Sequence, residues 1–271
     1  MKLTRHLTVN GPRWALNGAY LPQGMSLSMM LAMPHYSLID MLGRVDPGPD
    51  AVDPLLPPVD PEQEIWGSGV TYLRSRDARK AESATGDIYE KVYLAERPEI
   101  FFKAAGWRAV GPGQAVRIRE DATWNVPEPE LTLVINAAGD IVGYTAGNDM
   151  SSRDIEGANP LYLPQAKTYN GSAAVGPAIR LARVNELSNL PIRMAILRGE
   201  ETVFQGATAT DRMKRGFPEL AAYLYRELSF PHGALLMTGT GIVPPDDFTL
   251  APGDLIRITV GELTLENRVE R

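Results

Sequence analysis

Cysteine is missing from this 271-residue chain, which excludes disulfides, thiolate metal ligands and cysteine nucleophiles. Basic residues are also fewer than acidic residues. The 27 lysines and arginines stand against 33 aspartates and glutamates, which gives a net charge of −6. We expect no nucleic-acid partner, because nothing in this balance would neutralise phosphates.

Long apolar runs are absent as well. The most apolar stretch near the start, residues 25–33 ("MSLSMMLAM"), is far shorter than the ~20 residues that a membrane helix needs. We interpret it as part of the core or as a subunit contact. Since it also lies too deep in the chain for a signal peptide, we expect a cytoplasmic protein with no membrane partner.

What the chain does contain is typical of a soluble globular protein, with 44% apolar and 22% charged residues. Its length allows one large core, or a large domain with a smaller one attached. Residues 46–61, "DPGPDAVDPLLPPVDP", are too rich in proline for a helix or a central strand, so we interpret them as a linker. We therefore divide the chain into an N-terminal segment with this linker, residues 1–60, and a main domain, residues 61–271.

Two stretches of the main domain have helical patterns. The first begins near residue 71 and stops at Pro98. The second, "GFPELAAYLYRELS", predicts an amphipathic helix with Leu220, Leu224 and Leu228 on its apolar face.

Three other stretches predict β-hairpins. Residues 130–149 turn around Gly139 and Asp140, residues 191–206 turn around Gly199, and residues 253–269 form the tail. The main domain is therefore expected to be mixed β of the α+β class, mostly antiparallel with a few helices.

The first hairpin begins with two carboxylates, in "NVPEPELTLVI". Side chains two apart on a strand share a face, so Glu128 and Glu130 project together and repel each other unless a cation lies between them. Pro127 and Pro129 lack an N–H, so this strand end cannot be fully paired. We expect it to be held extended and open, as an edge that presents ligands.

The partner strand of this hairpin ends at Asp149. Antiparallel pairing through Gly139 places residues whose numbers add up to about 279 opposite each other, which puts Asp149 opposite about residue 130. Three carboxylates would then converge, and three hard oxygen ligands suit Mg²⁺, Mn²⁺ or Ca²⁺ rather than zinc. The alternative is ordinary turn chemistry, with a solvated "EPE" turn and an aspartate at a hairpin end.

Two cationic residues follow the hairpin. Lys167 stands among apolar and small residues in "PLYLPQAKTYNG", where a lysine is rarely placed without a partner. It is either solvated or part of a carboxylate-lined cleft, where it could neutralise an acid substrate or an enolate. Arg153 could bind a substrate carboxylate through its planar fork, or it could form an ion pair with Asp154 or Glu156.

Five stretches together resemble the fumarylacetoacetate hydrolase family: "PEPEL", "GYTAGNDMSSRDIE", "AKTYNG", "MTGTGIVPPDDF" and "PGDLIRITV". The resemblance covers about residues 65–270. It implies a β-roll with a small N-terminal domain, assembly as a homodimer or homotetramer, and a site at one end of the roll. It also implies a divalent metal, typically Mg²⁺, held by the three carboxylates named above. Lys167 and Arg153 match polar residues that line the family's site, and Thr240 matches one that contacts the acid end of the substrate.

Within the family, "GVTYLRSR", "ANPLYLPQAKTY" and "TGTGIVPP" look most like the enzymes that dehydrate 2-keto-3-deoxy sugar acids. This likeness implies a Mg²⁺-dependent hydro-lyase that converts a 2-keto-3-deoxypentonate, such as 2-keto-3-deoxy-D-arabinonate, into 2,5-dioxopentanoate. The metal would stabilise an enolate, and either Lys167 or Glu99 could move the C3 proton. Glu99 could alternatively be a helix-end or surface carboxylate.

Two other functions stay open: a hydrolase or decarboxylase of a diketo acid that uses the same metal-stabilised enolate, and a non-catalytic relative that binds an acid. Family hydrolases carry a histidine, paired with a glutamate, in the lid segment before the metal ligands, but "TYLRSRDARKAES" has none. The chain's histidines, His6, His35 and His232, lie elsewhere and are expected to be structural or surface residues. The missing histidine disfavours hydrolysis, and the intact carboxylate set with Lys167 disfavours the inert binder.

Overall fold

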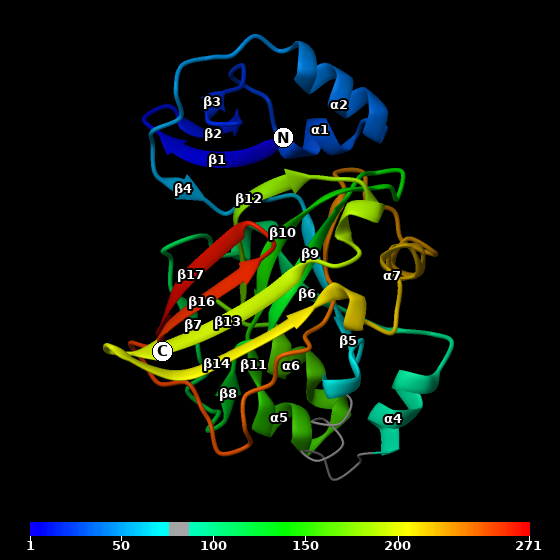
Figure 1. Ribbon diagram of the computed structural model, residues 1–271, viewed down its shortest axis with the longest axis vertical. Coiled ribbons are helices and arrows are strands. Elements are labelled where there is room, and N and C mark those ends of the chain that lie inside the picture. Colours follow the sequence, from blue (N-terminus) through cyan, green and yellow to red (C-terminus); the bar gives the residue numbers. More distant parts are fainter. Residues whose placement is uncertain (76–86) are drawn as a thin grey trace.

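A curled ten-stranded mixed sheet forms the body of the protein, and a five-stranded sheet packs against it (Figure 1). The computed structural model describes residues 1–75 and 87–271. The larger sheet follows the order β3-β2-β1-β12-β10-β9-β15-β5-β6, with β4 attached to β1, and the smaller one follows β14-β13-β16-β17-β7.

The strands of the larger sheet are β1 (Lys2–Thr8), β2 (Gly11–Leu16), β3 (Ala19–Tyr20), β4 (Leu55–Leu56), β5 (Glu64–Gly69), β6 (Glu99–Ala105), β9 (Pro129–Ile135), β10 (Ile141–Asp149), β12 (Ala173–Leu181) and β15 (Ala234–Met237). Those of the smaller sheet are β7 (Val116–Arg117), β13 (Pro191–Arg198), β14 (Glu201–Ala209), β16 (Leu255–Val260) and β17 (Leu263–Glu270). A separate ladder pairs β8 (Asn125–Val126) with β11 (Ser151–Ser152).

The helices of the described residues are short and pack around the sheets. They are α1 (Leu27–Leu31), α2 (His35–Arg44), α4 (Asp87–Leu94), α5 (Arg153–Ala158), α6 (Leu163–Lys167) and α7 (Phe217–Leu224), with single 3₁₀ turns η1 (Gly106–Arg108), η2 (Pro160–Tyr162), η3 (Val184–Leu187) and η4 (Thr210–Arg212). In residues 1–75 and 87–271, no helix is long and apolar enough to cross a membrane. The fold is the mixed β, α+β class that the sequence predicted.

The larger sheet separates two hydrophobic cores. Leu131 and Leu133 of β9 face a core shared with the five-stranded sheet and α7, whereas Val134 faces a core shared with α1 and α2. Because both faces are covered, β9 is buried at every position. The carboxylates at the ends of β9 and β10 therefore lie inside the protein.

The N-terminal residues extend the same sheet, since β1 pairs with β12. Residues 25–33 contain α1, whose Leu27, Met30 and Leu31 are buried in the second core, so the core interpretation of this stretch is confirmed. Residues 46–61 contain no helix and only the two-residue strand β4, as their prolines predicted.

The three predicted hairpins are confirmed as β9–β10, β13–β14 and β16–β17. The first helical pattern is confirmed by α4, although residues 76–86 of that stretch lie outside the described residues. The second helix ends earlier than predicted, at Leu224, and Leu228 beyond it is 45% exposed. The chain turns there, and Phe230 packs on Tyr225 with ring centroids 4.8 Å apart.

The predicted register of the first hairpin is wrong by two residues. Glu130 pairs with Gly147, and the Asp149 N–H donates to the carbonyl of Glu128 at 3.0 Å. The turn causes the shift, because it spans residues 136–140 and is held by the Asn136 side chain, which accepts from the Asp140 N–H at 2.8 Å. Next to the turn Ile141 pairs with Ile135, three residues from the predicted register, and a bulge after Ile141 reduces the difference to two.

The start of the hairpin is also less open than predicted. Residues 125–135 are all buried, because β8 pairs with β11 and the carbonyl of Asn125 accepts from the Leu250 N–H at 2.9 Å. Between β8, which pairs with β11, and β9, which pairs with β10, only Pro127 and Glu128 lie outside a strand. The prolines therefore mark a break inside the protein rather than a solvent-exposed edge.

Asp60, at the end of the proline-rich stretch, is a buried point of contact between the N-terminal strands and the main sheet. It accepts from Trp14 Nε1 at 3.1 Å and from the Ser28 N–H at 3.2 Å, and it pairs with Arg5 at 3.4 Å. Removing this carboxylate would leave the largely buried Arg5 cation, the buried Trp14 donor and the partly buried Ser28 donor without their acceptor.

We predict that Asp60→Ala lowers the free energy of unfolding by about 3 kcal/mol, because breaking a buried ion pair leaves an uncompensated charge. Urea denaturation followed by tryptophan fluorescence would measure it. The matched control is Asp40→Ala, which removes a solvent-exposed pair with Arg44 and should change stability little. Equal effects of the two substitutions would contradict this assignment.

Candidate functional site

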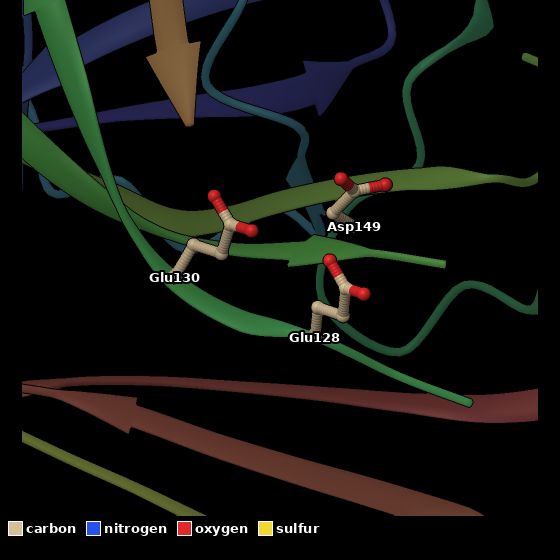
Figure 2. Close-up of side chains that lie close together, drawn as sticks. All are labelled: Glu128, Glu130 and Asp149. Atoms are coloured by element: carbon tan, nitrogen blue, oxygen red, sulfur yellow. The ribbon is translucent and has the colours of Figure 1, made fainter. Parts of the chain in front are cut away.

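Three carboxylates converge where β9 and β10 meet. Glu128 precedes β9, Glu130 lies on it, and Asp149 is the last residue of β10 (Figure 2). Their exposed fractions are 4%, 1% and 1%, and one oxygen from each lies within 4.8 Å of the others. The convergence predicted from the hairpin is present, and the alternative of solvated turn residues does not fit this burial.

The donor set fits a hard divalent cation. Two oxygens bound to one Mg²⁺ at ~2.1 Å are at most about 4.2 Å apart, and the longer bonds of Ca²⁺ allow about 5 Å. A spread of no more than 4.8 Å is therefore within reach of either ion after small side-chain adjustments. Carboxylate oxygens without histidine or cysteine favour Mg²⁺, Mn²⁺ or Ca²⁺.

The pKa of Glu130 reflects the convergence of negative charge in a buried site. Burial, followed by the Asp149 and Glu128 carboxylates, raises the pKa of Glu130 well above its usual range. The Gly239 N–H opposes this by donating to Glu130 Oε2 at 2.6 Å. Gly239 has φ +89°, and a Cβ there would lie 2.0 Å from Thr71 Oγ1, so glycine is required for this close approach.

Lys167 lies in a carboxylate-lined cleft, as the functional interpretation predicted. It is buried, and its Nζ donates to Glu128 at 2.8 Å, to Asp149 at 3.0 Å and to Ser151 Oγ at 2.6 Å. An ammonium has three protons, and these three acceptors use all of them. This geometry is that of a charged ammonium, fixed against two of the three carboxylates.

Lys103 is a second buried lysine at the same place, and the sequence analysis missed it. It lies on β6, is fully buried, and pairs with Asp149 Oδ1 at 2.6 Å. Burial lowers its pKa, while the Asp149 carboxylate opposes that shift. The signal was present in "EIFFKAA": a lysine in an apolar run is the same anomaly that singled out Lys167.

Arg153 takes the ion-pair role that was its alternative. Its Nη2 lies 2.7 Å from Glu128 Oε1, and its Nη1 donates to Glu156 Oε2 at 3.3 Å. Asp154 faces elsewhere and accepts from the Thr123 N–H at 2.6 Å. Arg153 and Glu156 are both buried. The guanidinium fork is engaged by two carboxylates, those of Glu128 and Glu156.

A small cavity adjoins the carboxylates and gathers most of the predicted residues. Its lining includes Glu99, Glu128, Asp149, Glu156, Lys167 and Thr240. A larger groove of about 1140 Å³ lies elsewhere, between α2, the β9–β10 turn and α7, and none of these charged groups lines it. We place the candidate site at the smaller cavity because the charges converge there.

Glu99 and Thr240 enter this cavity from different elements. Glu99 is the half-buried first residue of β6, so it is a strand residue rather than a helix-end carboxylate. Its carboxylate fits against Gly69, where a Cβ would lie 2.0 Å from Glu99 Oε2. Thr240 is buried, and its Oγ1 accepts from the Ile242 N–H at 3.1 Å.

None of the three histidines lines the described part of the cavity. His6 is buried in the N-terminal strands against the Asp53 carbonyl at 2.6 Å, His35 begins α2 and His232 is exposed, as expected of structural and surface residues. The segment in which family hydrolases carry their histidine, residues 71–83, lies largely outside the described residues.

The family profile described as "Fumarylacetoacetate (FAA) hydrolase C-terminal" matches residues 64–270. The chain belongs to the fumarylacetoacetate hydrolase family. It is 48% identical over 214 residues to a Haloferax volcanii protein named "Probable 2-keto-3-deoxyxylonate dehydratase", covering 78% of this chain and 73% of that one. It is 44% identical over 213 residues to the 2-dehydro-3-deoxy-D-arabinonate dehydratase of Saccharolobus solfataricus, covering 76% and 70%.

Solved structures agree with this placement. The apo form of 2-keto-3-deoxy-D-arabinonate dehydratase superposes with a TM-score of 0.85 at 35% identity, over 100% of this chain and 99% of that one. The same enzyme complexed with magnesium and 2,5-dioxopentanoate superposes with a TM-score of 0.83 at 34% identity, over 100% and 99%. The predicted family and the predicted β-roll fold are both confirmed.

The raised pKa of Glu130 predicts how the metal-free protein responds to pH. The folded protein binds this proton more tightly than the unfolded chain, so the contribution of Glu130 to stability is present below about pH 4.5 and is lost as the pH rises through the raised pKa. In EDTA, the ionisation of Glu130 should therefore lower the melting temperature between mildly acidic and neutral pH.

Thermal denaturation of wild type and Glu130→Gln across this pH range measures the contribution of Glu130 to that decrease, because the amide cannot titrate. Saturating Mg²⁺ should restore the wild-type melting temperature near neutrality, since a ligand at 100 times its Kd adds about 2.7 kcal/mol. The same pH slope in both proteins, or no response of wild type to Mg²⁺, would contradict the prediction.

Proposed function

We propose that this protein is a Mg²⁺-dependent dehydratase of a 2-keto-3-deoxypentonate that forms 2,5-dioxopentanoate. The observation that carries the proposal is the buried cluster of Glu128, Glu130 and Asp149 beside two buried lysines. It is supported by the likeness to two sugar-acid dehydratases and to a structure bound to magnesium and 2,5-dioxopentanoate. We also infer that the protein is a cytoplasmic homodimer or homotetramer.

The charge balance of the site favours an anionic substrate. Four buried carboxylates, the three of the cluster and Glu156, face three buried cations, which are Lys103, Arg153 and Lys167. With every group ionised, as metal binding requires of the carboxylates, this set has one net negative charge. A divalent cation would make it positive by one, and a monoanionic keto acid would then neutralise it. Buried charge is costly unless it is balanced, so this count fits a carboxylate substrate.

Glu128, Glu130 and Asp149 would hold the metal. A bound Mg²⁺ supplies Lewis acidity, which polarises a 2-keto oxygen and acidifies the neighbouring C3 protons. Removal of one C3 proton and loss of the C4 hydroxyl as water then form a C3–C4 double bond. Tautomerisation toward C5 gives the aldehyde of 2,5-dioxopentanoate, so one water leaves and no oxidant is needed.

Glu99 is our choice for the general base. It lines the cavity and is half-buried, whereas the Lys167 ammonium already donates its protons to three acceptors and has no lone pair to offer. Lys167 would act instead as a fixed positive charge beside the developing negative charge of the substrate. Because the guanidinium fork of Arg153 is paired with two carboxylates, we infer that Arg153 orients Glu128 and does not bind the substrate carboxylate. Thr240 is our candidate for the contact with that carboxylate.

The decisive assay incubates purified protein and Mg²⁺ with each C4 epimer of 2-keto-3-deoxypentonate. Formation of 2,5-dioxopentanoate, abolished by EDTA and by Glu128→Gln, is the expected result. Pyruvate with a two-carbon aldehyde would instead indicate carbon–carbon cleavage, which is the hydrolase-type alternative. Binding of the keto acid without turnover would indicate a non-catalytic acid-binding protein.

The packing of Glu99 against Gly69 gives a specific test of the base. In Gly69→Ala the new Cβ would overlap the end of a flexible side chain, so the Glu99 carboxylate must move while the backbone can stay. We predict that kcat falls ~10²-fold, toward the loss caused by Glu99→Gln, because positioned general bases contribute about 10²–10⁴-fold.

Steady-state kinetics and thermal denaturation of the same preparations check this prediction. Gly43→Ala, in α2, is the matched control, because its Cβ would meet only Met1 at 3.9 Å. Unchanged kcat in Gly69→Ala and Glu99→Gln would remove Glu99 from the mechanism and leave the metal site untouched.

A further inference from the structure

Lys103 contacts three groups that belong to two separate parts of the chain. Its Nζ pairs with Asp149 Oδ1 at 2.6 Å, donates to the Met150 carbonyl at 2.9 Å, and donates to the carbonyl of Lys167. Asp149 ends β10, Met150 follows it, and Lys167 ends α6. The buried ammonium of Lys103 therefore connects Asp149, a proposed metal ligand, to the backbone of Lys167.

The curl of the sheet makes this contact possible. Four strand-to-strand steps separate β10 from β6 in the order β10-β9-β15-β5-β6. With neighbouring strands about 4.8 Å apart, a flat sheet would put them about 19 Å apart, which is beyond the reach of a lysine side chain. Lys103 reaches Asp149 because the larger sheet rolls up and brings β6 back toward the end of β10.

Asp149 is consequently held by two ammonium groups. Lys103 contacts its Oδ1 and Lys167 contacts its Oδ2 at 3.0 Å, so the plane of the carboxylate is fixed from both sides. Each carboxylate oxygen has a further lone pair, so this arrangement leaves room for a metal bond. Partners that orient a metal ligand in this way typically contribute 10–100-fold to metal affinity or activity.

We propose that Lys103 is a positioning residue that fixes Asp149 relative to Lys167 and thereby sets the geometry of the metal site. The proposal rests on the proposed function for the identity of the metal. It does not depend on which substrate the enzyme uses, because its principal test measures metal binding in the absence of substrate.

The direction of the change in metal Kd distinguishes a positioning role of Lys103 from a purely electrostatic role. Removing a cation next to three carboxylates would, by electrostatics alone, tighten the binding of a divalent cation. Loss of orientation would weaken it. Lys103→Met keeps the length of the side chain and removes both its charge and its hydrogen bonds, so the two explanations predict opposite changes in Kd.

Isothermal titration of the EDTA-treated, full-length protein with Mg²⁺, repeated with Mn²⁺ by electron paramagnetic resonance, gives that Kd. Mildly alkaline buffer keeps protons from competing for the carboxylates. We expect Lys103→Met to raise the Kd for both metals at least tenfold. With saturating Mg²⁺ and a turned-over substrate, we expect kcat to fall more than KM rises, because misplaced groups act at the reacting atoms.

The matched control is Leu187→Ala, a core truncation in η3, which follows the end of β12 that does not pair with Asp149. It should lower the melting temperature while leaving the metal Kd unchanged. Lys103→Gln keeps donors for the two carbonyls but lacks the charge, and should fall between wild type and Lys103→Met.

Unchanged or tighter metal binding in folded Lys103→Met would overturn the proposal. So would the failure of both Lys103 variants to fold, which would assign the lysine a purely structural role. If wild type binds Mg²⁺ but dehydrates no keto acid, the proposed function fails while this inference is still tested by the Kd values.

Discussion

The site depends on one electrostatic constraint: three carboxylates are brought together where water cannot screen them. Glu128, Glu130 and Asp149 are almost fully buried, and burial together with the neighbouring Asp149 and Glu128 carboxylates raises the pKa of Glu130. Such a cluster requires positive charge nearby. Lys103, Lys167 and Arg153 supply part of it, and a divalent metal with its anionic substrate completes the balance.

The fold accounts for why the cluster can exist. Both faces of β9 are covered by hydrophobic cores, which fixes its register and aims Glu130 in one direction. The break at Pro127 and Glu128 interrupts the ladder between β8 and β9, so the glutamate side chain is placed at the end of a rigid strand rather than within it. Rigid strands on both sides hold the ligands more precisely than a loop would.

Much of this site could be predicted because its signals are local. Glu128 and Glu130 are two residues apart, so strand periodicity alone places them on one face, and a hairpin brings Asp149 to the same end. The two-residue error in register did not matter, because either glutamate can face the end of β10. The contacts of Lys103 with Asp149 and of Arg153 with Glu128 could not be predicted, because a pairing partner far away in sequence leaves no periodic signal near the residue itself.

The sequence by itself determined the fold class, the three hairpins and the hard-oxygen character of the metal site, since each follows from residues that are neighbours in the chain or joined by one turn. The tertiary structure alone decided which cations meet those carboxylates. Curling of the ten-stranded sheet brings β6 to β10, and the packing of α5 and α6 brings Arg153 and Lys167 to Glu128. These contacts depend on how whole strands and helices pack against one another, and that packing cannot be inferred from any short stretch of sequence.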